Sequence, residues 1–311
     1  MQKKTILFDK THNEMLNIED KEFAEFLDLL NRIDVIVKKS ESEQLKLEML
    51  KEIDLLVIGN PIDVFFSSNE VKLVVDFVRS GGGLLLLSEY GSDYLQKTNL
   101  NDISGKFGFT FEKNLIKEVN QANQNFISTL HIVNFVKHQL TNHLREIKIG
   151  GSCSLFLSKD AKPLLQTNEN SWSEVFNSST EQWLKEDEEK EQVIAAFTEF
   201  GKGKVVAIGD IDLFTADSNI GLHALDNQKF IENIINWLIE PVKESKITSF
   251  ILNQLGDLQF EIRESNKILN NIIETMTILE KRISYLEENS RLRSHPINLE
   301  HDGERESLQE E

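Results

Sequence analysis

The chain has 311 residues, of which 40% are hydrophobic, and its 34 Lys and Arg stand against 52 Asp and Glu, a formal net charge of −18. The apolar content supports a folded core and excludes a wholly disordered chain. The acidic excess repels phosphate backbones and anionic headgroups, so we expect no nucleic-acid partner. Cys153 is the sole cysteine, which excludes an intramolecular disulfide and a zinc site built from several cysteines.

No segment has the pattern of a targeting or membrane-spanning sequence. The N-terminal apolar run, residues 6–8, stops at Asp9, whereas a secretory signal needs roughly 7–15 apolar residues. No stretch approaches the ~20 apolar residues that cross a bilayer. We therefore predict a cytoplasmic protein without membrane insertion.

The first part of the chain alternates strand and helix patterns. Short apolar runs predict strands at residues 5–9, 34–38, 54–59 and 84–87. Apolar residues at helical spacing predict helices at residues 21–32, at residues 41–52, and from a cap at Ser67 or Ser68 to the Gly81-Gly82-Gly83 stop. Continuous apolar runs are typical of strands buried on both faces, so we predict an α/β fold whose parallel sheet is covered by helices on each side.

The pattern is less regular from residue 100 to residue 240. A short helix is expected at 100–107 and strands at 147–158 and 162–167, while the charged run 185–191 predicts a solvated loop or exposed helix. Two further strands, 193–200 and 204–208, flank Gly201-Lys202-Gly203 as in a hairpin, and an amphipathic helix is expected at 226–239. We assign residues 1–241 to this α/β domain.

Beyond Pro241 the apolar residues follow a heptad repeat, which predicts a coiled-coil helix within residues 242–289. Residues 290–311 are polar and acidic, and we expect them to be disordered. The apolar seam consists of Ile251, Leu255, Leu258, Ile262, Leu269, Ile272, Met276, Leu279, Ile283 and Leu286.

Such a seam requires a partner surface. We favour a homodimer or another coiled-coil partner protein, and the alternative is a helix folded back on the α/β domain. Ser265 interrupts the d positions, and the flanking polar residues Glu261, Asn266 and Glu280 are candidates for setting the register.

Ligands of parallel α/β sheets bind beyond the carboxyl ends of the strands. The loops there carry side chains that suit a carbohydrate or another small molecule, although ordinary turn chemistry explains them as well. The candidate pocket consists of His12, Asn13, Glu14, Gly59, Asn60, Ser88, Glu89 and Tyr90.

Two enzymatic alternatives remain open. Ser88 stands after a strand, where hydrolases place a nucleophile, but the surrounding pattern lacks the usual glycine and no histidine follows closely. Asp210 and Asp212 follow another strand, and paired carboxylates bind Mg²⁺ in many sites that transfer phosphoryl groups. Asp226 and Asn227 could approach them. No glycine-rich phosphate loop accompanies this pair, so turn and cap roles are favoured.

Other candidate groups do not form a convincing site. His131, His138 and His143 lack a metal-binding spacing, so we predict no metal site and no cofactor. Cys153 lies in a predicted strand far from Ser88 along the chain, and a buried core thiol is favoured over a nucleophile.

Several short motifs stand out along the chain: residues 6–9 with His12-Asn13-Glu14, 54–61, 66–71, 77–83, Ser88-Glu89, 99–108 and 135–141. Together they resemble the GIFT domain, which is shared by gliding-motility ABC-transporter auxiliary proteins and an intraflagellar-transport complex B subunit. A later stretch, 202–210 with Asp226-Asn227, is similar to uncharacterised prokaryotic proteins, which suggests an archaeal or bacterial source.

The resemblance implies a flavodoxin-like sandwich of the class I glutamine amidotransferase type that has lost its catalytic cysteine. Members are thought to bind a carbohydrate or a protein and not to catalyse. The transporter-associated members carry membrane helices that this sequence lacks, which argues against a transport role. We therefore favour a non-catalytic interaction module over a hydrolase using Ser88 or a metal-dependent enzyme using Asp210 and Asp212.

Overall fold

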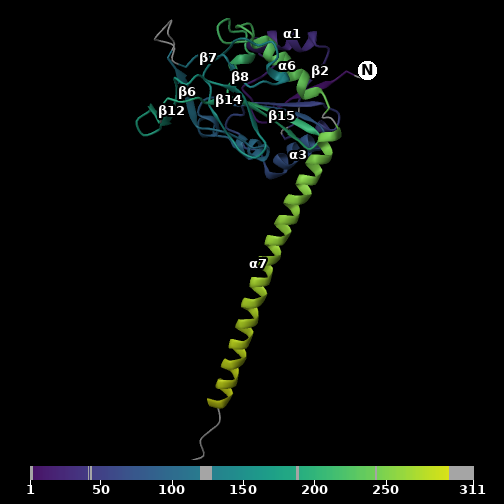
Figure 1. The fold of residues 1–311 in the computed structure, drawn as a ribbon, viewed down its shortest axis with the longest axis vertical. Helices are drawn as coiled ribbons and strands as arrows, with labels where there is room; N and C mark the ends of the chain where they lie inside the picture. The colour runs from purple at the N-terminus through teal and green to yellow at the C-terminus, as the bar shows by residue number, and fades with distance from the viewer. Residues whose placement is uncertain are drawn as a thin grey trace, which may run out of the picture. The chain divides into compact units, whose positions relative to one another are not determined.

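The computed structural model describes residues 3–40, 42, 44–119, 128–186, 189–241 and 244–293. The chain divides into two units, residues 1–250 and residues 251–311. The first unit is an α/β domain, and the second carries most of one long helix (Figure 1).

An eight-stranded sheet with the order β2-β1-β3-β4-β15-β14-β11-β8 forms the centre of the first unit. Its first five strands run parallel, and β14, β11 and β8 each pair antiparallel with their neighbours. The four strands from which the parallel sheet was predicted are therefore parallel, and the whole sheet is mixed because the predicted hairpin adds β14 antiparallel to β15. The strands are β1 (Thr5–Phe8), β2 (Ile36–Lys39), β3 (Leu55–Gly59), β4 (Gly83–Leu87), β8 (Asn134–Phe135), β11 (Lys162–Gln166), β14 (Val193–Phe200) and β15 (Gly203–Ile208).

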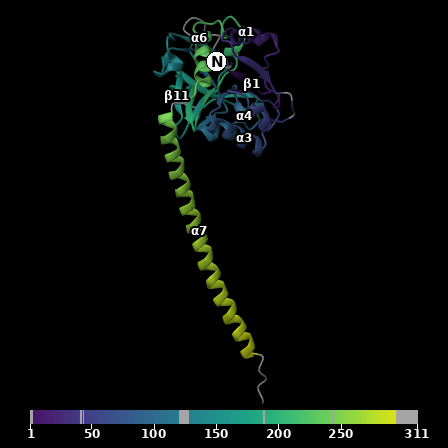
Figure 2. The same cartoon turned by 90° about the vertical axis from the view of Figure 1, so that its right-hand side faces the viewer.

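Helices cover both faces of this sheet (Figure 2). On one face, α1 (Ala24–Arg32) and α6 (Asn227–Ile239) pack on alternate strand residues such as Phe8 and Val57. On the other, α3 (Ser68–Arg79) and α5 (Leu100–Ser104) pack on the intervening residues, such as Leu56 and Leu86. The strands therefore bury both faces, as their continuous apolar runs predict.

Short helices and small sheets complete the unit. A 3₁₀ turn, Lys21–Phe23, precedes α1 and another, Gly105–Phe107, follows α5. Strands β13, β12 and β6 form one small sheet, and β10 pairs with β5 and β7 with β9. The remaining elements are α2 (Leu47–Leu50), α4 (Ser92–Gln96), β5 (Phe109–Phe111), β6 (Asn114–Glu118), β7 (Leu130–Ile132), β9 (Ile147–Ile149), β10 (Leu155–Leu157), β12 (Ser171–Asn177), β13 (Gln182–Lys185) and two further 3₁₀ turns, Gln139–Thr141 and Asp212–Phe214.

Three predicted elements differ from those observed. The helix expected at 41–52 is only α2, one turn long, and the strand expected at 147–158 is two strands, β9 and β10, with Gly150 and Gly151 between them. The charged run begins inside β13, where Lys185 pairs with Glu174 of β12. Local composition concealed this strand because it has only four residues and begins and ends with an exposed polar side chain.

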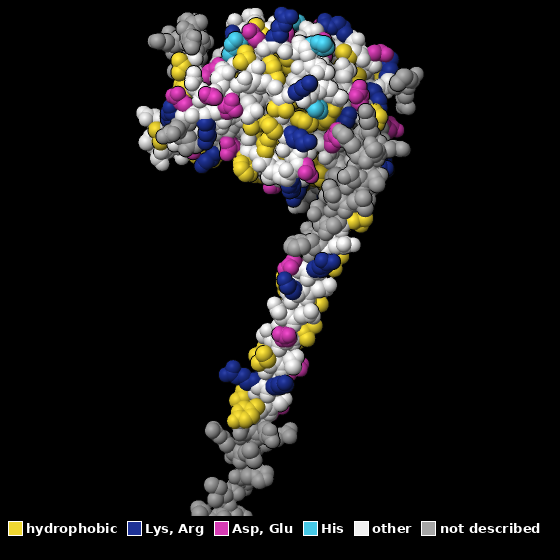
Figure 3. Space-filling model, in the orientation of Figure 1, with side chains coloured by type: hydrophobic (Ala, Val, Ile, Leu, Met, Phe, Trp, Pro, Cys, Tyr) yellow, Lys and Arg dark blue, Asp and Glu magenta, His cyan; other side chains and the backbone are white. Residues whose placement is uncertain are grey.

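The long helix is α7 (Glu244–Arg293). Among its described side chains, the seam residues from Leu255 to Leu286 are exposed, and Ile272 has the smallest exposed fraction, 50%. Hydrophobic side chains recur along the helix (Figure 3). The side chain of Ile251 lies outside the described residues, as does the predicted tail beyond Arg293. No described helix is both long and apolar enough to cross a membrane.

Candidate functional site

Four neighbouring strands end in buried polar residues. Asp9 follows β1, Asn60 follows β3, Ser88 follows β4, and Asp210 follows Gly209 after β15. All four are at most 2% exposed. Because β1 has β2 on one side and β3 on the other, the strand order reverses at β1, which is where α/β sheets usually bind ligands.

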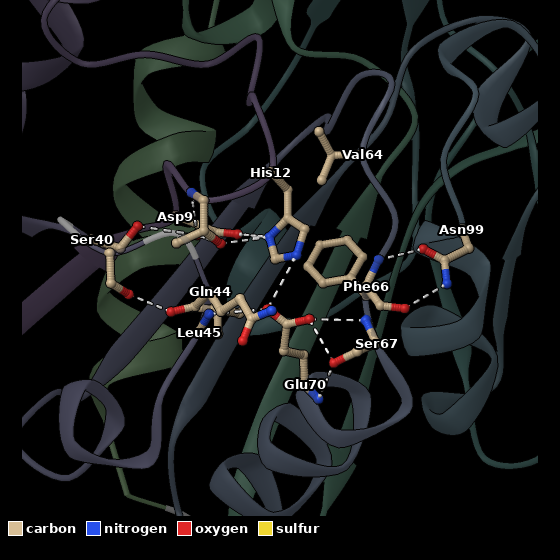
Figure 4. A network of polar contacts seen from close by, with 12 residues as sticks. Asp9, His12, Ser40, Gln44, Leu45, Val64, Phe66, Ser67, Glu70 and Asn99 are labelled. Carbon is tan, nitrogen blue, oxygen red and sulfur yellow. Dashed lines mark hydrogen bonds and ion pairs between the residues drawn. The ribbon is translucent and has the colours of Figure 1, made fainter.

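His12 lies between two carboxylates at this point (Figure 4). Its Nδ1 lies 2.7 Å from Oδ2 of Asp9, and its Nε2 lies 3.4 Å from Oε1 of Glu70. The imidazole also stacks on the ring of Phe66, with centroids 3.7 Å apart. Both His12 and Asp9 are buried, so this arrangement fixes the position and orientation of the imidazole.

The partners of His12 are themselves held by hydrogen bonds. Ser67 caps α3 and forms a capping box with Glu70, whose Oε2 accepts bonds from the backbone and the hydroxyl of Ser67. Oε1 of Glu70 also accepts a 3.0 Å bond from the backbone N–H of Leu45. The side-chain amide of Asn99 accepts a 2.7 Å hydrogen bond from the backbone N–H of Phe66 and donates a 3.0 Å bond to the carbonyl of Phe66. The site therefore joins the loops after β1, β2 and β3.

Asp9 accepts several hydrogen bonds. Its Oδ1 accepts bonds from the backbone and hydroxyl of Thr11, at 2.9 and 2.8 Å, and from the hydroxyl of Ser40 at 3.1 Å. Burial opposes ionisation of this carboxyl, but His12 and these donors outweigh burial and hold the pKa of Asp9 below its ordinary value. Asp9 is therefore an anion near neutral pH.

Glu14 is buried differently. Neither carboxylate oxygen accepts a hydrogen bond of good geometry, although both are shielded from solvent. Burial, followed by repulsion from Asp9 and a carboxyl–carboxyl hydrogen bond with Asp9, raises the pKa of Glu14 well above its ordinary value, and the backbone of Gly59 opposes this rise only in part. Ligand atoms of Asp9, His12 and Glu14 all lie within 4.8 Å of one another.

A second cluster lies at the ends of β4 and β15. Ligand atoms of Glu89, Asp210 and Asp212 lie within 4.8 Å of one another. Burial and the neighbouring carboxylates raise the pKa of Glu89 well above its usual range and that of Asp210 to about 7. Burial, with Glu22 and Asp217 nearby, also raises the pKa of Asp212. Hydrogen bonds from Ile211 to Glu89 and from Leu213 to Asp210 stabilise the cluster.

The surroundings of Ser88 do not activate it as a nucleophile. Among the residues that the structure describes, no histidine or carboxylate forms a hydrogen bond with its hydroxyl. The hydroxyl interacts instead with Cys153, which the sequence analysis placed far away. Burial is the main reason that the pKa of the Cys153 thiol lies well above its ordinary value, so it stays protonated, as expected of a core thiol.

Two segments of the chain cover this edge of the sheet. Leu16 donates a backbone bond to Gly59 and lies so close that a Cβ on Gly59 would come within 2.5 Å of its own Cβ. Cys153 donates a backbone bond to Gly209, where a Cβ would lie 2.1 Å from the carbonyl oxygen of Cys153. Backbone and side chains thus fill the space beyond β3, β4 and β15.

The predicted pocket residues divide into buried and exposed groups. His12, Glu14, Asn60, Ser88 and Glu89 direct polar atoms into the buried edge. Asn13 is exposed and donates a bond to Ile62, while Tyr90 is 41% exposed and packs edge-to-face on Trp183. The structure does not bring these two side chains to the buried clusters.

Other candidates have structural partners elsewhere. Asp226 accepts backbone bonds from Arg145 and Glu146, and Asn227 binds the backbone of Lys148, so they secure the start of β9 and not the Asp210 cluster. His131 pairs with Glu146. His138 stacks on Phe197.

A groove of about 1140 Å³ opens away from these clusters, and none of the predicted site residues lines it. Its polar side chains include His131, Glu146 and Asn168.

Sequence reasoning did not assign Asp9, Glu70 or Cys153 to this edge of the sheet. Asp9 and Glu70 appeared only within the motifs at residues 6–9 and 66–71. The Ser-x-x-Glu spacing of Ser67 and Glu70 predicts a capping box, but it gives no sign that Glu70 also faces His12. Cys153 joins the edge because the chain between β9 and β10 returns over it.

Comparisons with known proteins agree with this architecture. Residues 5–121 match the family model of the IFT52 GIFT domain. A solved structure described as the mmIFT52 N-terminal domain has 17% identity and a TM-score of 0.62, covering 76% of this chain and 97% of that chain. The cytoplasmic protein STM3548 from Salmonella typhimurium has 11% identity and a TM-score of 0.51, covering 77% and 100%. No curated protein matches. Residues 5–121 are therefore similar to the IFT52 GIFT domain, and the solved structures share the fold of this chain.

Proposed function

We propose that this protein is a non-catalytic scaffold, in which a GIFT domain is presented by a homodimeric coiled coil or joins a larger complex through that helix. The observation that carries the proposal is the heptad seam of α7, whose described members are at least half exposed. The similarity to an IFT52 domain supports membership of a complex. Cytoplasmic location is part of the proposal.

The absence of an activated nucleophile supports a role without catalysis. The buried Ser88 contacts a protonated thiol, and no described residue serves it as a base. A domain descended from an amidotransferase-like scaffold that lost its cysteine would have this arrangement. A carbohydrate or other small ligand at the carboxyl edge would have to displace Leu16 or the segment around Cys153.

Burial of the seam supplies the association energy. Each large apolar side chain that becomes buried contributes ~1.5–3 kcal/mol, and ordering of the helices offsets much of the total. Ile268 and Ile273 flank the seam at g and e positions and are also exposed, at 61% and 53%. They widen the apolar surface beside Ser265, where the d position is polar.

The flanking positions favour a parallel, in-register homodimer. In that arrangement each g residue faces the e residue five positions later in the partner helix. Arg282 then faces Glu287, Ile268 faces Ile273, and Glu261 faces Asn266. No pair formed in this way across residues 254–287 brings two like charges together, so these flanking pairs do not oppose the parallel orientation.

The principal test replaces two central seam residues. We expect L269D/M276D to abolish self-association, because burying two carboxylates in the seam costs more than the remaining contacts supply. Sedimentation velocity measures the oligomer. The matched control is N270D/T277D, which adds the same charges one residue further along at b positions. If L269D/M276D sediments like the parent, the seam is not the association surface.

Orientation is tested by cysteine cross-linking. Cys153 is buried, so L258C and L286C each add a single accessible thiol. In a parallel, in-register dimer both variants form a symmetric disulfide under mild oxidation, which non-reducing electrophoresis detects. An antiparallel pair would cross-link only when the two variants are mixed, and a helix folded on its own domain would not cross-link.

A further inference from the structure

The side chains of Asp9, His12 and Glu14 have the composition of a metal-binding shell. We propose that they hold a divalent transition-metal ion of the Zn²⁺ type at the strand-order reversal of the sheet. One imidazole and two carboxylates are donors that Zn²⁺ accepts, whereas Mg²⁺ and Ca²⁺ favour oxygen alone. This inference is independent of the coiled coil.

The unpartnered carboxylate of Glu14 is the observation that carries the inference. Buried polar groups in folded proteins are almost always hydrogen-bonded, and an exception calls for an explanation. Both oxygens of Glu14 are buried without a donor of good geometry. A cation bound between the Glu14 and Asp9 carboxyl groups would satisfy Glu14.

The second feature is the set of groups behind the ligands. A histidine that binds a metal through one nitrogen usually donates its other N–H to a carboxylate, which fixes the ring. His12 directs Nδ1 toward Asp9 and Nε2 toward Glu70, at 2.7 and 3.4 Å. Thr11 and Ser40 hold Oδ1 of Asp9, which leaves Oδ2 toward His12. Glu14 has no comparable set of well-formed hydrogen bonds.

The distances suit an ion after small side-chain movements. Ligand atoms about 2.1 Å from a tetrahedral Zn²⁺ lie roughly 3.4 Å apart. The three groups of this site lie within 4.8 Å of one another. Oδ2 of Asp9 and Nδ1 of His12, which lie 2.7 Å apart, would separate slightly. The carboxylate of Glu14 would move closer to both. Glu14 belongs to the loop that precedes Leu16, so the bound ion would fasten this loop over β3.

The Glu89, Asp210 and Asp212 cluster is a weaker candidate for the same ion. It offers only oxygen, and Asp210 Oδ2 is its one described oxygen that is buried without a partner. It serves as an internal comparison, because an ion of the Mg²⁺ type would prefer it.

The test uses the full chain freed of metal with a chelator. Co²⁺ is the spectroscopic probe, since its visible absorption reports coordination by nitrogen and oxygen, and Zn²⁺ is titrated by calorimetry. We expect one tight site per chain and a raised melting temperature, because an ion that binds only the native state stabilises it. E14Q should abolish the site while keeping the fold, since the side chain of Glu14 has no comparable set of well-formed hydrogen bonds to lose. E70Q should weaken affinity about 10–100-fold.

Matched controls identify the site. E19Q changes a glutamate of the same loop that pairs with Lys10 and Lys39, and D210N alters the other cluster. Both should leave the Co²⁺ spectrum unchanged. The inference is overturned if the parent binds neither ion, if E14Q binds as the parent does, or if D210N alone removes binding. Stronger binding of Mg²⁺ than of Zn²⁺ would also overturn it.

Discussion

Individual buried carboxylates make this domain sensitive to pH. Asp210 is 0% exposed and its pKa is raised to about 7, chiefly by burial and then by Asp212. The folded state therefore keeps a proton on Asp210 at a pH where the unfolded chain has lost it. Because the native state binds more protons, this group's contribution to stability falls as pH rises from about 4 toward 7.

We expect D210N to remove this dependence. The neutral amide needs no proton, so the variant should gain stability relative to the parent as pH rises from about 5 to about 8, by up to roughly 1.4 kcal/mol per pH unit. Urea unfolding of the parent and of D210N at pH about 5 and about 8 measures this change in the free energy of unfolding. The exposed D28N variant controls for net charge. Equal pH dependence of D210N and the parent would contradict the assigned state of Asp210.

The sequence predicts part of the site at residue level. Polar residues after parallel strands are expected to gather at one edge, and His12, Glu14, Asn60, Ser88 and Glu89 do so. His12 and Glu70 are 58 residues apart in the chain, and their contact depends on how α3 packs beside the loop after β1. No local pattern encodes such a distance.

At the scale of elements, the start of α3 joins a helix cap to the site. Ser67 supplies the cap, and Glu70 both closes the box and holds the backbone of Leu45. A helix that begins with a capping box is predictable from sequence. Its second role is not, because it depends on the chain after β2.

Substitutions should separate the two roles. We expect S67A to cost about 1 kcal/mol, as caps generally do. E70A should cost about 2 kcal/mol or more, because it also leaves the buried N–H of Leu45 unpaired. The urea concentrations at the midpoints of unfolding measure the loss of stability in both variants. S80A, at the other end of α3 and exposed, should be near the parent. Equal effects of S67A and E70A would show that the cap alone matters.

The strands of the central sheet differ in how well the sequence predicts them. β1, β3, β4 and β15 are buried along their whole length and were predicted from continuous apolar runs. In the small sheets, β5, β7 and β12 were missed because β5 and β7 have three residues each and β12 mixes polar and apolar side chains. Such strands form through pairing with distant partners and not through local preference.

At the scale of the whole molecule, charge opposes the proposed assembly. Each chain carries a net charge of −18, so two copies repel each other over a distance that salt shortens. Apolar burial in the seam has no such dependence on screening.

We therefore expect association to tighten several-fold as salt rises from about 0.05 M to about 0.5 M. Sedimentation equilibrium measures the dissociation constant at each concentration. N270D/T277D, with more negative charge outside the seam, should show a steeper dependence. Weaker association at high salt would mean that ion pairs such as Arg282 with Glu287 dominate the interface.

The chain segments that cover this edge of the sheet can lie there because Gly59 and Gly209 have no Cβ. Leu16 and Cys153 can lie where they do only because residues 59 and 209 are glycine, and a Cβ at either would collide with them. A single-base change in either codon gives alanine and would push the covering segment outward. The cover over this edge of the sheet is therefore sensitive to a single point mutation at either glycine.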